Sequence, residues 1–283
     1  MAASRVKGYE LIAQIASGAK SHIWRARQLS TGDAYAVKIV QRGHGVDERY
    51  FRQMENEYRI ARRFNHPNLA RVYEFIPSGF LFWTFQVAVV VELVPGPNLA
   101  ELAVSQPLPL PRLIDLYIQL ADGLGYMHSQ GFVHLDMKPH NVVVTSDDKA
   151  KIVDFGLCMP TGQYNPRIQG TPAFMAPEQI VKGRVDERTD IYNLGATMFY
   201  ILTGKSAQIM LTQRNGNGKS GVADQAFRSL SVDIPEELEA LIMTSCRPNP
   251  ADRPWTMNDV ATRLRDVAQQ MSKTTPDARP VAD

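Results

Sequence analysis

The sequence is poor in cysteine and in net charge. Its 283 residues include two cysteines, Cys158 and Cys246, which lie far apart and match neither a disulfide framework nor a metal-ligand spacing. We therefore expect free thiols and a reducing, cytoplasmic location. The formal net charge is only +2, so there is no electrostatic reason to expect binding to nucleic acid.

Long apolar runs are also missing. The longest, residues 81–94, contains Thr84, Gln86 and Glu92 and falls short of the roughly 20 apolar residues that a membrane helix needs. The N-terminal residues lack the apolar region of a secretory signal peptide. We therefore expect no membrane segment in this chain. Hydrophobic residues still make up 44% of the sequence, enough for a substantial core in one large domain or two small ones.

Chemistry-bearing residues gather in one stretch. Residues 134–141 read His-Leu-Asp-Met-Lys-Pro-His-Asn, and residues 154–156 read Asp-Phe-Gly after an apolar segment that predicts a β-hairpin. Such a hairpin would bring Asn141 and Asp154 together. A carboxylate beside an amide carbonyl suits a hard cation such as Mg²⁺, which takes oxygen ligands. Asp136 would then be free for proton transfer.

Taken together, these residues resemble the catalytic segment of protein kinases. In that family, His-x-Asp-x-Lys-x-x-Asn is followed by Asp-Phe-Gly and then by Ala-Pro-Glu; here these motifs lie at 134–141, 154–156 and 176–178. A lone Asp-Phe-Gly would mean little, because Asp and Gly are common turn residues. The joint pattern, in this order and at these distances, is far more specific.

The resemblance covers about 9–270 and implies an α+β, bilobal protein-kinase-like fold. We expect a small β-rich N-lobe with one main helix at 1–94, a larger, mainly helical C-lobe at 95–271, and a disordered tail at 272–283. The periodicities agree, since early β-prone runs alternate with turn residues and later apolar residues recur every three or four positions. The polar, glycine-rich segment 205–231 is expected to be a flexible loop.

In the small lobe, the resemblance implies a nucleotide site. The glycine-rich loop that covers the ATP phosphates would fall at residues 15–23, but it keeps only the middle glycine, Gly18. Lys38 is expected to contact the α- and β-phosphates. Glu57, on an amphipathic helix predicted over 47–64, is expected to hold Lys38 in place. Taken alone, Lys38 would equally be a solvated charge at the edge of a sheet.

Apolar side chains are expected to enclose the adenine. The resemblance places Val91 at the gatekeeper position and turns the carbonyl of Glu92 and the N–H of Val94 towards the base. Each apolar candidate would serve equally well in an ordinary core. The expected nucleotide-binding residues are Ile15, Gly18, Ile23, Ala36, Lys38, Val91, Glu92, Val94, Val143 and Asp154.

The resemblance also implies catalytic roles. Asp136 would orient the acceptor hydroxyl and take its proton, and Lys138 would lie beside the γ-phosphate. The expected catalytic residues are Asp136, Lys138, Lys38 and Glu57. Asn141 and Asp154 would bind Mg²⁺, with Mn²⁺ as an alternative. Lys138, together with Gly-Thr-Pro at 170–172, resembles serine/threonine kinases, so we expect transfer of the γ-phosphate of ATP to a serine or threonine of a protein substrate.

Two departures from the family pattern keep alternatives open. The depleted glycine loop suggests a pseudokinase that acts as a nucleotide-binding or scaffold module; a small-molecule phosphotransferase of related fold is a third possibility. Leu135 replaces the arginine that commonly pairs with a phosphorylated activation loop. Because leucine cannot bind phosphate, we predict that activity does not depend on activation-loop phosphorylation through this position. The sequence leaves the oligomeric state open.

Further residues match the scaffold of the family. Glu178 and Arg253 correspond to its buried ion pair in the larger lobe. Asp190, at the start of a predicted helix, is expected to hydrogen-bond the catalytic loop from behind. These three residues would support the site without taking part in the chemistry.

Overall fold

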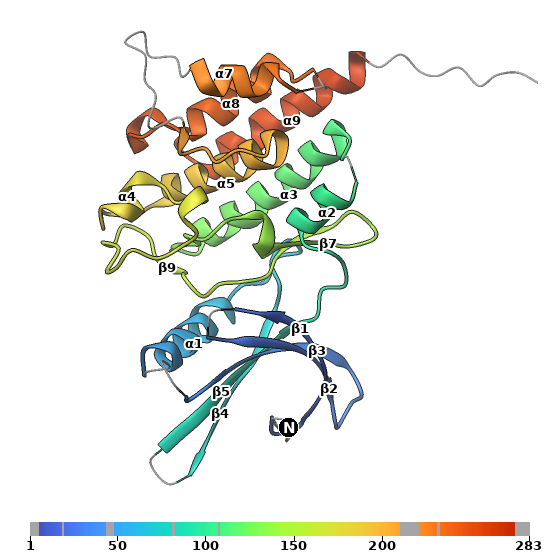
Figure 1. Cartoon of the computed structure of the whole chain (residues 1–283), viewed down its shortest axis with the longest axis vertical. Coiled ribbons are helices and arrows are strands. Elements are labelled where there is room, and N and C mark those ends of the chain that lie inside the picture. Colours follow the sequence, from blue (N-terminus) through green and yellow to red (C-terminus); the bar gives the residue numbers. More distant parts are fainter. Residues whose placement is uncertain are drawn as a thin grey trace, which may run out of the picture.

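The computed structural model describes residues 6–18, 20–43, 48–80, 83–106, 108–209, 221–230 and 233–274. The chain forms two lobes stacked along its long axis, a β-rich lobe made by the first third of the chain and a helical lobe made by the rest (Figure 1). The α+β, bilobal architecture expected from the sequence is confirmed. Among the described residues, no helix combines the length and the apolarity needed to cross a bilayer.

An antiparallel five-stranded sheet forms most of the small lobe, with strand order β1-β2-β3-β5-β4. Its central strands are rich in valine, whose branched side chains pack well on a pleated surface. Helix α1 (Glu48–Ala61) packs against β4 and β5 through Phe51, Met54 and Ile60, which recur on one helix face. The strands are β1 (Tyr9–Ser17), β2 (His22–Gln28), β3 (Ala34–Gln41), β4 (Val72–Phe80) and β5 (Trp83–Glu92).

The large lobe is built around α3 (Leu110–Ser129) and α5 (Glu187–Thr203), which contact each other and α9. Both bury most of one face in the main core. The other helices are α2 (Leu99–Ser105), the short α4 (Pro177–Ile180), α7 (Gly221–Arg228), α8 (Glu236–Ser245) and α9 (Met257–Thr274).

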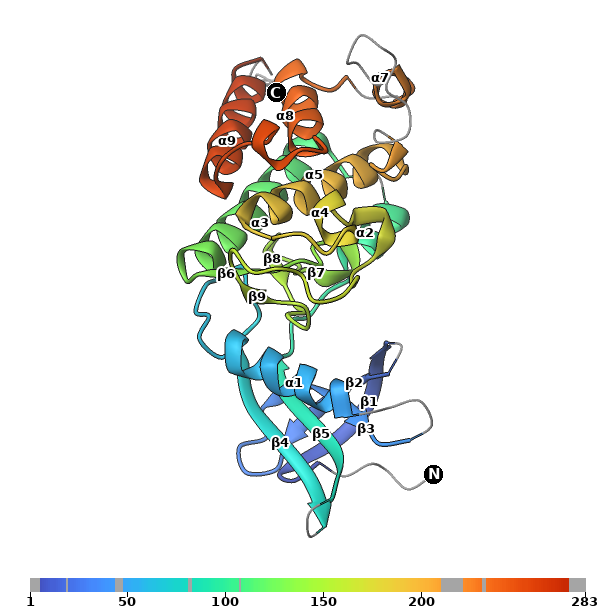
Figure 2. The same cartoon turned by 90° about the vertical axis from the view of Figure 1, so that its left-hand side faces the viewer.

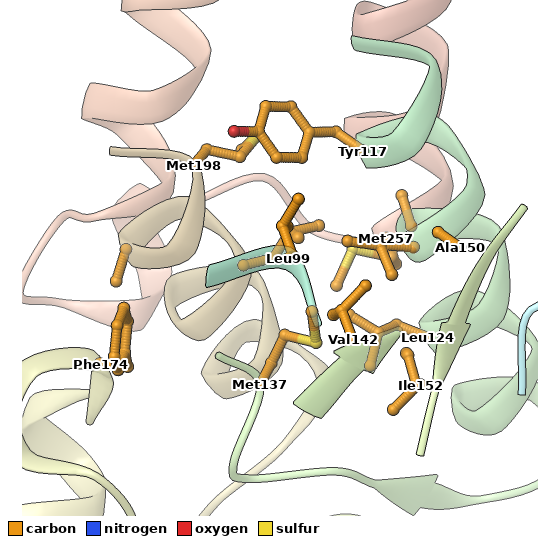
Figure 3. Close-up of a cluster of buried hydrophobic side chains, with 14 of the residues drawn as sticks. Leu99, Tyr117, Leu124, Met137, Val142, Ala150, Ile152, Phe174, Met198 and Met257 are labelled. Atoms are coloured by element: carbon orange, nitrogen blue, oxygen red, sulfur yellow. The ribbon is translucent and has the colours of Figure 1, made fainter. Parts of the chain in front are cut away.

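Two short strand pairs and the turns between them carry the catalytic segment over this core. Strand β6 (Phe132–Val133) pairs with β9 (Met159–Pro160), and β7 (Val142–Val144) pairs with β8 (Ala150–Ile152). Figure 3 shows Met137, within the catalytic stretch 134–141, and Val142, directly after it, pointing into the same apolar cluster as Leu124 of α3. Packing on the large lobe therefore anchors this stretch at its middle and at its C-terminal end.

Two expectations about local order differ from the structure. The segment 205–231 contains α7, which is anchored by buried Ala226 and by Phe227, whose ring meets that of Phe199 edge-on at 5.4 Å. The polar composition of the segment gave no indication of these two core contacts. Gly218, Lys219 and Ser220 lie outside the described residues. Helix α9 runs to Thr274, so it enters the expected tail, whose residues 275–283 are likewise outside the description.

Candidate active site

Lys38 of β3 lies between two carboxylates from different parts of the chain. Its Nζ atom is 2.8 Å from Glu57 Oε2 on α1 and 2.9 Å from Asp154 Oδ1, which follows β8. The side chain of Glu57 is 3% exposed, whereas that of Asp154 is 39% exposed. The contacts therefore join the small lobe to the catalytic segment of the large lobe, with Asp154 on the open side.

Burial and opposite charge compete in setting the pKa values of this cluster. Burial lowers the pKa of Lys38, but Asp154 and Glu57 outweigh it and raise the pKa above its usual value. Burial opposes ionisation of Asp154, yet the charge and hydrogen bond of Lys38, with the N–H of Gly156, lower its pKa to about 2. Burial and the neighbouring Asp154 raise the pKa of Glu57, against the effect of Lys38. Asp154 is therefore ionised at neutral pH.

A second cluster surrounds Asp136. Lys138 Nζ donates to Asp136 Oδ2 and to Thr171 Oγ1, both at 2.7 Å. The backbone N–H of Thr171 donates to Asp136 Oδ1 at 3.2 Å. Asn141 Nδ2 donates to the carbonyl of Asp136 at 2.8 Å and to its Oδ2 at 3.1 Å. These contacts orient the carboxylate from three sides.

The hairpin β7–β8 connects the two clusters. Val142 pairs with Ile152, and the N–H of Val153 donates to the carbonyl of Asn141 at 3.0 Å. Asn141 is the last residue of a 3₁₀ turn just before β7, and Asp154 lies just beyond the end of β8. The predicted hairpin thus brings Asn141 and Asp154 to the same end of the strand pair.

The donor set at this end suits a divalent cation. Asn141 uses its amide N–H groups on Asp136, and Asp154 uses Oδ1 on Lys38 and Gly156. Among the described residues, none donates a hydrogen bond to Asn141 Oδ1 or Asp154 Oδ2. Both are hard oxygen ligands. The described residues contain no group of three or more His, Cys, Asp or Glu side chains arranged as a metal cage, so a cation here would take further oxygens from phosphate and water.

The expected nucleotide-binding residues of the sheet share one face. Ile23 lies directly opposite Lys38 on β3, and Ala36, two residues before Lys38, lies directly opposite Val91 on β5. Opposed residues of antiparallel strands and residues two apart on one strand face the same side. Ile15, at 51% exposure, lies on β1 near the end of the sheet that carries the loop. The sheet therefore gathers four of the predicted residues on the face that bears Lys38.

The turn between β1 and β2 is closed by a hydrogen bond of 2.8 Å from the N–H of Gly18 to the carbonyl of Ser21. Ala19 lies outside the described residues. A hairpin turn thus forms here although only one glycine of the family loop is present.

The segment joining the lobes contains the other expected nucleotide contacts. The carboxylate of Glu92 accepts two hydrogen bonds from Lys151 Nζ, at 2.7 and 2.9 Å, and so attaches β5 to β8. The N–H of Val94 donates to no described residue. Val143, on β7, forms an isolated bridge with Asn98. A backbone donor and an apolar side chain are therefore available on the two sides of this connection.

Asp190 holds the catalytic loop from below, as the sequence indicated. Its carboxylate accepts the backbone N–H groups of His134 and Leu135, each at 2.8 Å, and it is fully buried. Leu135 has a φ of 67°, in the left-handed region that is costly for leucine. Hydrogen bonds from these backbone N–H groups to a buried carboxylate therefore fix an unfavourable backbone conformation directly before Asp136.

Two residues of the site were not among the predicted ones. Thr171 contacts both Asp136 and Lys138; its only sequence signal was the Gly-Thr-Pro motif. Gln53, one helical turn before Glu57, donates from Nε2 to the carbonyl of Gly156 at 3.1 Å. Nothing in the sequence identified Gln53, because a glutamine on an amphipathic helix is an ordinary surface residue.

Comparison with known proteins is consistent with this geometry. A family model described as "Protein kinase domain" matches residues 9–283. The chain is similar to the serine/threonine-protein kinase PknL of Mycobacterium tuberculosis (28% identity over 276 residues, 93% of this chain and 66% of the relative). It is also similar to PknB of Mycolicibacterium smegmatis (27% over 286 residues, 95% and 44%) and to PrkC of Bacillus subtilis (23% over 272 residues, 92% and 41%). This chain thus spans 41% to 66% of these relatives' lengths.

Proposed function

The chain belongs to the protein kinase family, and from that premise we propose that it transfers the γ-phosphate of ATP to a serine or threonine hydroxyl of a protein. Members of this family use ATP and a divalent metal ion. The observation that carries the proposal is the convergence of two ionic clusters, Lys38–Glu57–Asp154 and Asp136–Lys138, at one end of the β7–β8 hairpin.

Lys38 and the apolar face beside it would bind the nucleotide. Glu57 fixes Lys38 on the face that also presents Ile23, Ala36 and Val91, so the ammonium group would contact the α- and β-phosphates while adenine lies against the apolar side chains. Asn141 Oδ1 and Asp154 would hold Mg²⁺, with Mn²⁺ as an alternative. When bound, the cation neutralises charge on the phosphate oxygens.

The second cluster would position the acceptor. Asp136 would accept the proton of the attacking hydroxyl, which must lie within hydrogen-bond reach of its carboxylate. Lys138 touches both Asp136 and Thr171, so its positive charge would lie where the γ-phosphate approaches the hydroxyl. The remaining backbone N–H contact from Thr171 keeps the carboxylate aimed at that point.

Serine or threonine is the proposed acceptor because the Lys138–Thr171 contact joins the two features that resemble serine/threonine kinases, and because the relatives reported above bear that name. The pseudokinase alternative receives no support from those names. A reducing, cytoplasmic setting fits the two free thiols: both are buried, and burial raises the pKa of Cys246 to about 12 and that of Cys158 well above its usual value.

Radiolabel transfer from [γ-³²P]ATP to a general protein substrate such as casein tests the proposal. We expect phosphoserine or phosphothreonine with the wild-type chain and loss of nearly all transfer with Asp136→Asn, which keeps the shape of the side chain but cannot take the proton. Asp33→Asn, the same change in the exposed β2–β3 turn, should transfer normally. Equal transfer by wild type and Asp136→Asn, or phosphate found only on tyrosine, would refute the proposed reaction.

A further inference from the structure

A cavity of about 380 Å³ lies between α1 and the activation segment, the residues 154–178 that follow β8. In both views α1 lies on the side of the small lobe that faces β9 (Figures 1 and 2). The volume is at the lower end of the range for small-molecule sites. The cavity is separate from the Asp136 cluster, because neither Asp136 nor Lys138 lines it.

The lining has a strong local excess of positive charge. Arg49 and Arg52 contribute from α1 and Arg167 from the activation segment, and no aspartate or glutamate is among the described residues that line the cavity. The chain as a whole carries a formal charge of only +2, so this clustering does not simply reflect a basic protein. Like charges gathered in one lining favour an anionic ligand.

The guanidinium groups of Arg52 and Arg167 have N–H donors that are not used within the described residues. Arg52 forms no hydrogen bond or ion pair with any described residue, and Arg167 forms a single long hydrogen bond, 3.3 Å from its Nη2 to Gln53 Oε1. A guanidinium carries five N–H donors in a planar fork that matches the oxygens of a phosphate. Most of the donors of Arg52 and Arg167 therefore remain for a ligand.

Another part of the lining is apolar. Leu135 occupies the cavity wall where the family pattern has an arginine, and Leu157 and Met159 of the activation segment lie beside it. A bare inorganic ion would leave this surface in contact with water. A ligand with an uncharged body next to its anionic group would cover it.

We propose that this cavity binds a small organic phosphate, with its phosphate held by Arg52 and Arg167 and its uncharged body against Leu135, Leu157 and Met159. None of the described residues that line the cavity is a serine, threonine or tyrosine, so the proposed phosphate belongs to a separate ligand and not to a phosphorylated side chain of the lining.

Binding here would act on the kinase site. Gln53 accepts the hydrogen bond from Arg167 and donates to the carbonyl of Gly156, whose N–H donates to Asp154. Glu57 lies one turn further along the same helix. A ligand that joins Arg52 to Arg167 therefore favours the arrangement in which Glu57 and Asp154 both reach Lys38. This regulatory consequence rests on the proposed function, whereas the binding itself does not.

Calorimetric titration with phenyl phosphate tests the binding, with the nucleotide site filled by a non-hydrolysable ATP analogue and Mg²⁺. We expect saturable, salt-sensitive binding, tighter than that of inorganic phosphate, while phenol binds poorly. In the Arg52→Gln/Arg167→Gln double variant, affinity should fall about tenfold or more, because hydrogen bonds to a charged group are lost. Arg62→Gln, the same change just beyond α1 and outside the lining, should bind normally.

A single Arg52→Glu variant, altered at an exposed position of α1, serves if the double variant does not fold, as judged by circular dichroism; it too should lose binding. The proposal is overturned if phenyl phosphate shows no saturable binding up to about 10 mM, or if it binds the arginine variants as well as the wild type. The proposal is also overturned if the arginine variants lose turnover although the wild type binds no phenyl phosphate.

Failure of the proposed function gives a different result. The Asp136→Asn protein should bind phenyl phosphate as the wild type does, whether or not the wild type transfers phosphate. In an active protein, saturating phenyl phosphate should lower the KM for ATP or raise kcat, and Arg62→Gln should respond equally. Unchanged kinetics would overturn the regulatory consequence alone.

Discussion

The buried ion pair between Arg253 and Glu178 offers the most quantitative prediction. Its two bonds, Nη1 to Oε1 at 2.7 Å and Nη2 to Oε2 at 2.9 Å, form a parallel fork, and the arginine side chain is 0% exposed. Arg253 also donates to the carbonyls of Arg247, Arg188 and Pro248. Replacing it with methionine keeps similar length and volume but removes every one of these donors.

The loss should be large because Glu178 would be left charged in a buried position. Removing one partner of a buried pair typically costs about 3–5 kcal/mol, which reflects the uncompensated charge more than the attraction that is lost. For a chain of this size, this corresponds to a fall in Tm of about 10 °C. Removing both charges with Arg253→Met/Glu178→Met should recover part of the loss, since no unpaired carboxylate then remains.

Arg265→Met is the matched control. Arg265 Nη2 also reaches both oxygens of a carboxylate, at 2.6 and 2.7 Å from those of Asp122, but its side chain is 47% exposed. An exposed pair contributes about 1 kcal/mol or less. Urea unfolding followed by circular dichroism measures all variants. The reasoning fails if Arg253→Met costs no more than Arg265→Met, or if the double variant is less stable than the single one.

Two further predictions concern charge in the site. The pKa of Asp154 is about 2 in the folded protein against an ordinary value of 3.8, so its ionisation stabilises the fold above pH 4, and this contribution is lost as the pH falls towards 2. The difference in Tm between wild type and Asp154→Asn should therefore shrink from pH 6 to pH 3. A constant difference would contradict this. Protein treated with phosphatase should retain its turnover, because Leu135 cannot pair with phosphate; nearly complete loss, restored by phosphate on Thr161, would show otherwise.

The residues of the two ionic clusters could be predicted from the sequence because their chemistry restricts both type and order. The motifs that contain them lie on a strand or beside a hairpin, which brings their side chains close together. The structure joins these residues by direct contacts or through one strand pair; they are Lys38, Asp136, Asn141 and Asp154. The helix predicted over 47–64 is present as Glu48–Ala61, since its apolar period is clear. Periodicity and motif spacing are local signals, so they survive without knowledge of the tertiary contacts.

What could not be predicted depends on contacts between distant segments. Gln53 reaches Gly156 across the two lobes, and Phe227 enters the core against Phe199 from a polar segment. In each case the residue type is unremarkable at its own position, and only the partner gives it a role. The cavity beside α1 belongs to the same class, because Arg52 and Arg167 come to line one cavity only after folding.

The replacement of arginine by Leu135 shows how the loop keeps its geometry without a cation at that position. Hydrogen bonds fix both backbone polar groups of Leu135: its N–H donates to Asp190, and its carbonyl accepts from Gln179 Nε2, each at 2.8 Å. The side chain is free of any positioning task and packs with Val133 and Val185 in an apolar cluster. A phosphate on the activation segment would find no cation there. An anion that couples this segment to α1 would instead meet the arginines that line the same cavity as Leu135, namely Arg49, Arg52 and Arg167.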